Sequence, residues 1–110
     1  MGAPERGDLV WLDFSPQAGH EQAGRRPALV LSPRAYHRRT PYAVVCPITS
    51  RVKGYPFEVE LPPGLAIAGA VLADQVKSID RHARRIEVAG RVPENVVAEV
   101  TLRVAALLEG

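Results

Sequence analysis

The hydrophobic period of this sequence changes at Pro93, and this change limits the fold more than any other feature. Before Pro93, apolar residues occur in short runs separated by proline, glycine and serine, as in strands joined by turns. After Pro93, apolar residues recur from Val96 to Leu108 with the spacing of a helix. The sequence therefore predicts a small sheet followed by one C-terminal helix.

Segments with an apolar or alternating pattern are predicted as strands: residues 8–14, 27–31, 42–48, 57–61, 69–73, 75–79 and 86–92. Residues 34–38 have room for one or two helical turns. Pro47 predicts an edge strand or a strand end. Pro93 suits the first position of the helix, and Glu94 complements its dipole. We expect a mainly β fold with a C-terminal helix (α+β), in which a bent sheet or half-open barrel is covered by the helix on one open side.

Length and composition fit a soluble globular protein. We expect the 110 residues (1–110) to form a single domain. The net charge is only +2, so no broad basic field exists. Basic residues are nevertheless clustered between Arg25 and Lys53, and most are arginines, whose planar fork can bind two phosphate oxygens. A solvated basic face is the alternative interpretation of this cluster.

The single cysteine, Cys46, excludes an intramolecular disulfide framework and a cysteine-based zinc site. Because it lies in an apolar run, we expect it to be a buried hydrophobic side chain rather than a nucleophile. The sequence shows no signal peptide and no apolar stretch long enough to span a membrane, so we expect a cytoplasmic protein.

A turn-rich polar stretch, residues 17–26, is predicted as a loop that ends where a strand begins at Pro27. His20, Glu21 and Gln22 place an imidazole, a carboxylate and an amide next to the guanidinium groups of Arg25 and Arg26. An acid–base candidate beside a fixed positive charge suits a polyanionic substrate. The alternative is an ordinary solvated connection.

Polar residues interrupt apolar segments at four points: His20–Glu21, Arg26, Thr49–Ser50 and Asp74–Gln75. Strand ends of a small bent sheet can meet at one rim, which would bring together a base, a guanidinium and hydroxyl donors. These groups suit RNA cleavage by the neighbouring 2′-hydroxyl, in which a base, a cation and an acid act on one phosphate. In the alternative interpretation, Asp74 caps a turn or pairs with an arginine.

Other kinds of site find little support in the sequence. His20, His37 and His82 are far apart and lack the spacing of paired metal ligands. No nucleophile-elbow motif surrounds Ser50, and no glycine-rich loop of the nucleotide-binding kind is present. We therefore expect neither a metal nor another cofactor.

Five blocks of the sequence, in this order and spacing, are similar to the MazF/PemK (Kid) family of toxin endoribonucleases: residues 7–16, 19–33, 46–50, 53–59 and 73–80. The specific part is the pattern Gly-x-Glu-Gln-x-Gly-x-Arg-Pro at residues 19–27, combined with Asp-Gln-x-x-x-Ile-Asp at residues 74–80. The resemblance covers almost the whole chain.

This resemblance implies a small SH3-like barrel of the CcdB/MazF toxin type that works as a homodimer. It implies metal-independent, sequence-specific cleavage of single-stranded RNA, leaving a 2′,3′-cyclic phosphate and a 5′-hydroxyl, and so inhibition of translation and growth. It also implies a MazE-like antitoxin whose disordered acidic tail occupies the RNA groove. We expect the helix after Pro93 and the strand from Val71 to Ile79 to form the dimer surface.

The resemblance also implies the site residues. The expected catalytic residues are Arg26, Glu21, Thr49, Ser50, His20 and Asp74, and the expected RNA contacts are Gln22, Arg25, Arg51, Lys53, Phe57, Gln75 and Lys77. The PemK branch has an arginine two residues before its aspartate, where this chain has Leu72. Arg26 is therefore the better candidate for the cationic role. Which of Thr49 and Ser50 supplies the hydroxyl, and which residue is base or acid, stays open.

Two alternatives have the same fold. One is a gyrase poison of the CcdB type, an activity that depends on a tryptophan near the C-terminus, whereas the tryptophan here is Trp11. The other is a catalytically inactive RNA-binding module, which would bind RNA without cutting it.

Overall fold

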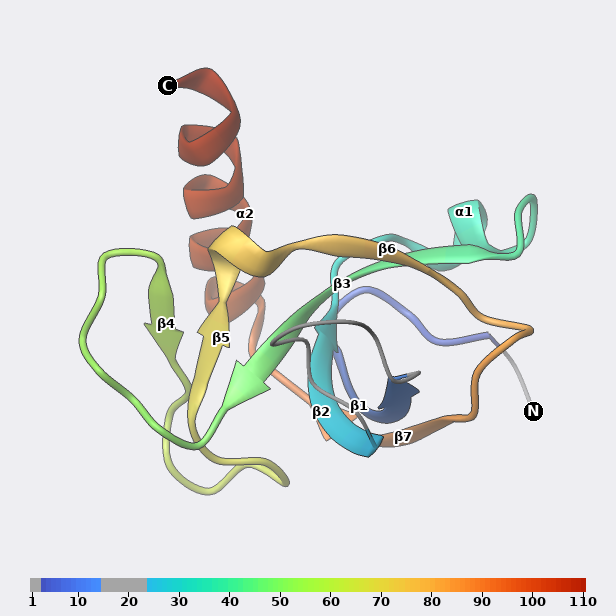
Figure 1. Cartoon of the computed structure of the whole chain (residues 1–110), viewed down its shortest axis with the longest axis horizontal. Coiled ribbons are helices and arrows are strands. Elements are labelled where there is room, and N and C mark those ends of the chain that lie inside the picture. The colour runs from blue at the N-terminus through green and yellow to red at the C-terminus, as the bar shows by residue number, and fades with distance from the viewer. Residues whose placement is uncertain (1–2, 15–23) are drawn as a thin grey trace.

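The computed structural model describes residues 3–14 and 24–110, which form a bent antiparallel sheet and one long helix (Figure 1). The elements are, in chain order, β1 (Asp8–Phe14), β2 (Gly24–Val30), α1 (Arg34–His37), β3 (Tyr42–Thr49), β4 (Glu58–Glu60), β5 (Ala70–Leu72), the 3₁₀ turn η1 (Ala73–Gln75), β6 (Lys77–Asp80), β7 (Ile86–Arg91) and α2 (Glu94–Glu109). The predicted mainly β fold with a C-terminal helix is confirmed.

The strands are hydrogen-bonded in the order β4-β5-β3-β2-β1-β7, and β6 pairs with the first half of β3. Strand β3 therefore has neighbours on both sides, so of the two alternatives predicted from Pro47 the edge strand is wrong, whereas the strand end fits, since β3 ends at Thr49. Pro47 pairs with Ala28 of β2, and it lies between the residues of β3 that pair with β6 and those that pair with β5. A proline without an N–H is tolerated at such a change of partner, near the end of the strand.

Strand β2 begins three residues earlier than the sequence predicts, at Gly24 rather than Pro27. The polar residues before Pro27 continue the ladder with β1, since Arg26 is opposite Leu12 and Arg25 is opposite Asp13. Pairing with a strong neighbouring strand outweighs the loop-like composition of these residues. As a result, both arginines are placed by a strand.

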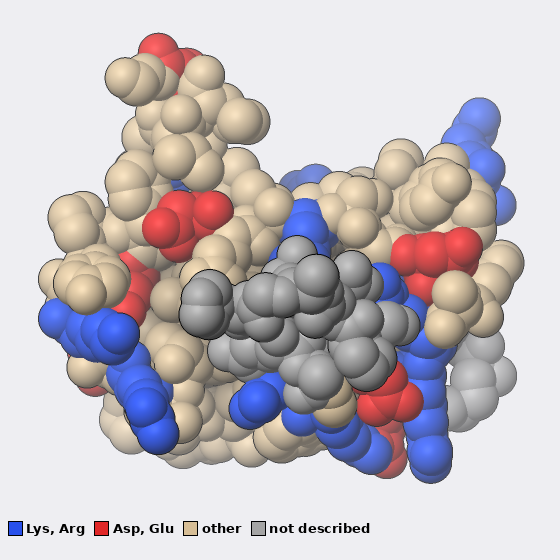
Figure 2. Space-filling model, in the orientation of Figure 1, with Lys and Arg blue, Asp and Glu red and all other residues tan. Residues whose placement is uncertain are grey.

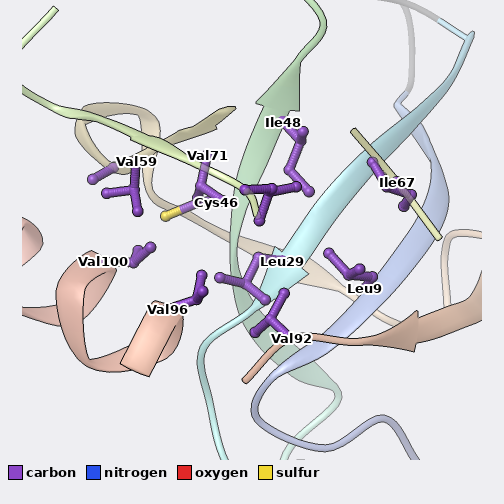
Figure 3. Packing of buried hydrophobic residues seen from close by; sticks show 12 residues of the cluster. Leu9, Leu29, Cys46, Ile48, Val59, Ile67, Val71, Val92, Val96 and Val100 are labelled. Atoms are coloured by element: carbon purple, nitrogen blue, oxygen red, sulfur yellow. The ribbon is translucent and has the colours of Figure 1, made fainter. Parts of the chain in front are cut away.

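Apolar side chains are buried on both faces of the sheet. Figure 3 shows the larger cluster, in which Val96 and Val100 of α2 lie close to Leu29, Cys46 and Val71 of the sheet. The second cluster is formed by Val10, Leu12, Ala28, Val30, Ala43, Val45 and Ile79. Because successive residues of β1 from Leu9 to Leu12 pack in opposite clusters, the middle of that strand is apolar without alternation.

Helix α2 begins at Glu94, and Pro93 is its capping residue rather than its first helical residue as predicted. Val96 and Val100 are buried against the sheet, whereas Leu102 and Leu108 are 65% and 77% exposed. The helix therefore has an apolar side that the described part of the chain leaves uncovered. Among the described residues, no helix is long and apolar enough to cross a membrane.

Candidate functional site

A hollow of about 590 Å³ opens where the start of β2 and the end of β3 lie next to each other. Its walls are formed by Trp11, Arg25, Arg26, Pro27, Ile48, Thr49, Ser50, Arg51, Ala66, Ile67 and Ala68. The structure thus brings Arg26, Thr49 and Ser50 together, as expected for strand ends that meet at one rim. We call this depression the first hollow.

Arg26 and Thr49 reach the first hollow from firmly placed backbone. Arg26 pairs with Leu12 in the β1–β2 ladder, and Thr49 pairs with Ala70 in the β3–β5 ladder. The Oγ1 atom of Thr49 accepts a hydrogen bond of 3.0 Å from the backbone N–H of Arg51. That contact orients the hydroxyl group and leaves its own hydrogen to donate, which suits an anionic ligand.

Arg25 lies beside Trp11 at the edge of the first hollow. Its guanidinium carbon is 5.8 Å from the centre of the Trp11 ring, and its Nη2 donates to the carboxylate of Glu87 on β7. Both partners of this ion pair are well exposed, so it contributes little to stability and mainly positions Arg25. Glu87 could not be predicted from the sequence, because its proximity to Arg25 depends on β7 pairing with β1.

A second hollow of about 500 Å³ adjoins the first. It is lined by Thr49, Arg51, Lys53, Tyr55, Pro56, Phe57, Glu58, Leu72, Asp74 and Gln75. Thr49 and Arg51 border both hollows, so the two depressions share a border at the end of β3.

The expected site residues are divided between these depressions. Asp74 and Gln75 of η1 line the second hollow with Lys53 and Phe57, and they are separated from Arg26 by the end of β3. Lys77 lies on β6 opposite Val45 and borders neither hollow. His20, Glu21 and Gln22 lie outside the described residues.

Positive charge is local on this side of the molecule. Figure 2 shows Lys and Arg side chains over the loop between β3 and β4 and along the lower edge of the molecule. Arg25, Arg26, Arg51 and Lys53 border the two hollows, and Asp74 and Glu58 are the carboxylates that line them. The field around the end of β3 therefore favours an anion.

Cys46 is buried and lies outside both hollows. Burial raises the pKa of its thiol to about 12, and the negative charge of Asp74 contributes to the same direction. The thiol is thus neutral at physiological pH and is not a nucleophile. Within the described ranges, no group of three or more His, Cys, Asp or Glu side chains is arranged to hold a metal ion.

The arrangement is a cationic, hydroxyl-bearing depression at the edge of a bent sheet, and its charges favour an anionic ligand. A family model described as "PemK-like, MazF-like toxin of type II toxin-antitoxin system" matches residues 5–108, and the chain belongs to this family. It is 45% identical over 105 residues to the endoribonuclease toxin MazF of Escherichia coli K12, covering 96% of this chain and 94% of that protein. It is 38% identical over 109 residues to the Escherichia coli endoribonuclease PemK, covering 94% and 81%.

Solved structures agree with this assignment. The crystal structure of MazF (Form-I) from Deinococcus radiodurans superposes with a TM-score of 0.90 at 55% identity and covers 97% of both chains. A MazE–MazF complex (Form-II) from the same organism gives a TM-score of 0.88 at 56% identity, covering 96% of both chains. The family resemblance and the fold predicted from it are confirmed, and the curated relatives are named endoribonucleases.

Proposed function

We propose that this chain is a sequence-specific endoribonuclease that cuts single-stranded RNA, and that cutting messenger RNA stops translation and growth. The observation that carries the proposal is the meeting of Arg26, Thr49 and Ser50 in the first hollow. One cation and two hydroxyl groups on a shared wall can hold a phosphodiester and stabilise the charge that develops during its cleavage. The endoribonuclease names of the relatives support the same reaction class.

The proposed reaction uses the RNA's own 2′-hydroxyl as nucleophile. A base takes the hydroxyl proton, O2′ attacks the adjacent phosphorus, and the bond from phosphorus to the 5′-oxygen breaks as an acid protonates that oxygen. The products are a 2′,3′-cyclic phosphate and a 5′-hydroxyl. Arg26 would neutralise the phosphorane, and the hydroxyl hydrogen of Thr49 or Ser50 would bind one of its oxygens.

The proton carriers are proposed among His20, Glu21 and Asp74. Each general acid or base step would contribute a factor of about 10²–10⁴. Asp74 flanks Thr49 from the second hollow, while Arg26 flanks it from the first. A phosphate at Thr49 would therefore lie between a carboxylate and a guanidinium. The reaction requires a base, an acid and a cation, so we expect it to proceed without added metal.

We also propose that the chain works as a homodimer, as a single toxin domain of residues 1–110 in the cytoplasm. The support is the apolar side of α2, where Val97, Leu102 and Ala105 line a depression together with Arg6 and Arg91. A domain of this size has limited capacity to cover such a surface alone. Sedimentation at micromolar concentration tests this, and a monomer that still cleaves RNA would contradict it.

The segment from Val71 to Ile79, which the sequence also suggested for the dimer surface, is formed by β5, η1 and β6 rather than by one strand. Val71 and Ile79 are buried inside the chain, in the two apolar clusters. The proposed dimer surface is therefore centred on α2, and from this segment only exposed residues such as Ser78 can contribute.

The proposed protein partner is a MazE-like antitoxin. Its disordered acidic tail would lie in the RNA groove, with carboxylates near Arg26 and Arg51 and apolar side chains where bases would lie. The local positive charge at the end of β3 supports this placement. Folding of such a tail on binding allows it to wrap a large surface.

Incubation of the purified chain with a long RNA in EDTA, followed by mapping of the new 5′ ends, tests the proposed activity. We expect cuts at one short sequence, with 5′-hydroxyl and cyclic phosphate ends. RNA that is bound but never cut would indicate an inactive binding module instead. Activity that disappears with chelator and returns with a divalent ion would overturn the proposed mechanism.

A further inference from the structure

We infer that the second hollow is a nucleobase subsite next to the cleavage centre, in which the ring of Tyr55 is the stacking surface. This inference rests on the proposed function, because it requires RNA as the ligand. It assigns a role to Tyr55, which the sequence did not single out, and to the loop that carries it. The loop connects β3 to β4 and is the green loop at the left of Figure 1.

Tyr55 has the exposure and the neighbours of a stacking residue. It is 60% exposed although it is a large aromatic side chain, and it lines the second hollow. The Nζ atom of Lys53 lies 5.7 Å from the centre of its ring. Proteins that bind single-stranded nucleic acid combine aromatic faces for the bases with nearby cations for the backbone. Here Tyr55 supplies the aromatic face and Lys53 supplies the cation.

The loop that carries Tyr55 is held at several points. One carboxylate oxygen of Glu58 accepts hydrogen bonds from the backbone N–H groups of Lys53 (2.9 Å) and Gly54 (2.8 Å). Gly54 has a φ of +78°, a conformation that glycine adopts without strain. Arg103 of α2 donates to the carbonyl oxygen of Pro56. Because these contacts order the loop before RNA arrives, less conformational entropy is lost on binding.

The remaining walls of the second hollow suit a base. Phe57 and Leu72 are half-buried and apolar, and Gln75 has an amide that can both donate to and accept from a base edge. Thr49 and Arg51 border both hollows, so a base in the second hollow belongs to a nucleotide beside the phosphate held at Thr49. Stacking on Tyr55 therefore helps to hold the RNA strand in place beside that phosphate.

The test measures binding without cleavage, using a fluorescein-labelled pool of random 2′-O-methyl RNA about 12 nucleotides long, which covers the usual site size. Alanine substitution of a stacking aromatic costs about 5- to 150-fold in affinity, and stacking tolerates any base. We expect a loss in that range for Tyr55→Ala, and an affinity within about twofold of the wild type for Tyr55→Phe, which keeps the ring.

Tyr42→Ala is the matched control, because Tyr42 is an exposed tyrosine at the opposite end of β3. It should bind the pool like the wild type. A second arm uses an abasic scan of a single 2′-O-methyl RNA that the wild type binds. At the stacked position, removing the base should make the wild type and Tyr55→Ala bind equally.

The outcomes separate this inference from the proposed function. If Tyr55→Ala binds the pool as tightly as the wild type, or if no abasic position removes its defect, the stacking subsite is overturned even when the wild type cleaves RNA. If the Tyr55-dependent binding is found but no RNA is ever cut, the subsite stands and the proposed nuclease activity is overturned.

Discussion

Gly69 lies against the carbonyl group of Thr49, so closely that a Cβ atom at position 69 would be 2.1 Å from the Thr49 oxygen. The same atom would be 3.0 Å from the Thr49 carbonyl carbon, and Gly69 has a φ of +129°. Glycine is therefore required for two reasons, the conformation and the space. The contact fixes the end of β3 at the point where the two hollows meet.

Replacing Gly69 with alanine should therefore displace Thr49. We expect Gly69→Ala to destabilise the fold by about 1–3 kcal/mol, because the strained conformation and the backbone clash must both be relieved. A displacement of about 1 Å at the site should reduce RNA cleavage by about 10²-fold. Thermal unfolding and the cleavage rate of the folded fraction measure the two effects.

Gly64→Ala is the control for the conformational part of this effect. Gly64 also has a positive φ, of +90°, but no atom lies within 4 Å of an added Cβ. This variant should lose some stability and keep its cleavage rate. Equal rate losses in both variants would show that the close approach to Thr49 is not what matters.

Arg26→Ala should reduce the cleavage rate by about 10²–10³-fold, as removal of a group that stabilises transition-state charge does. Arg26 is exposed at the start of β2, so the unfolding temperature should change little. Arg38→Ala, at the exposed end of α1, is the control and should cleave like the wild type. Normal turnover by a folded Arg26→Ala variant would remove Arg26 from the catalytic set.

Glu58→Ala should weaken RNA binding without changing the chemical step. Its carboxylate holds the backbone of Lys53 and Gly54, so its loss should loosen the loop and raise KM at constant kcat. Glu58→Gln keeps an acceptor oxygen, so its KM should lie between that of the wild type and that of Glu58→Ala. Glu60→Ala, an exposed change on the same strand, should be silent. A fall in kcat instead of a rise in KM would place Glu58 in the chemistry.

The buried thiol of Cys46 should make stability depend on alkaline pH. Burial raises its pKa to about 12, so the folded state keeps the neutral thiol while the unfolded chain ionises near pH 9. The stability that the buried neutral thiol contributes to the folded state is fully present below pH 9 and is lost as pH rises towards 12. Between pH 8 and pH 11 the free energy of unfolding of the wild type should fall by about 2–3 kcal/mol more than that of Cys46→Ala. Parallel stability curves for the two proteins would contradict this assignment.

The regular part of the fold could be predicted because its signals are local. Strand β1 was predicted at its observed bounds, Asp8–Phe14, since its central residues Leu9–Leu12 are apolar on both faces. The start of α2 was predicted within one residue from the period of its valines and leucines. The start of β2 was missed, because the pairing of Gly24–Arg26 with β1 is a tertiary effect that composition does not report.

The site was predictable only where a residue type itself suggests chemistry. Arg26, Thr49 and Ser50 were expected at one rim and do meet there. Glu87, Tyr55 and Gly69 were not singled out, because each acts through a neighbour distant in sequence or through loop geometry. Likewise, the separation of Asp74 from Arg26 by the end of β3 follows from strand order, which the sequence did not specify.

The last prediction is that RNA and an antitoxin tail exclude each other. If Arg25, Arg26, Arg51 and Lys53, which line the two hollows, each engage a phosphate, log Kd for single-stranded RNA should vary with log salt with a slope of about 3. An acidic peptide that pairs with the same cations should show a similar salt dependence and should displace 2′-O-methyl RNA competitively.

Arg51→Ala should weaken the binding of both the RNA and the peptide, because Arg51 borders both hollows. Anisotropy titrations with two labels can measure both affinities in one sample. A ternary complex of protein, peptide and RNA, with chemical-shift changes at the end of β3 from both ligands, would refute this mutual exclusion.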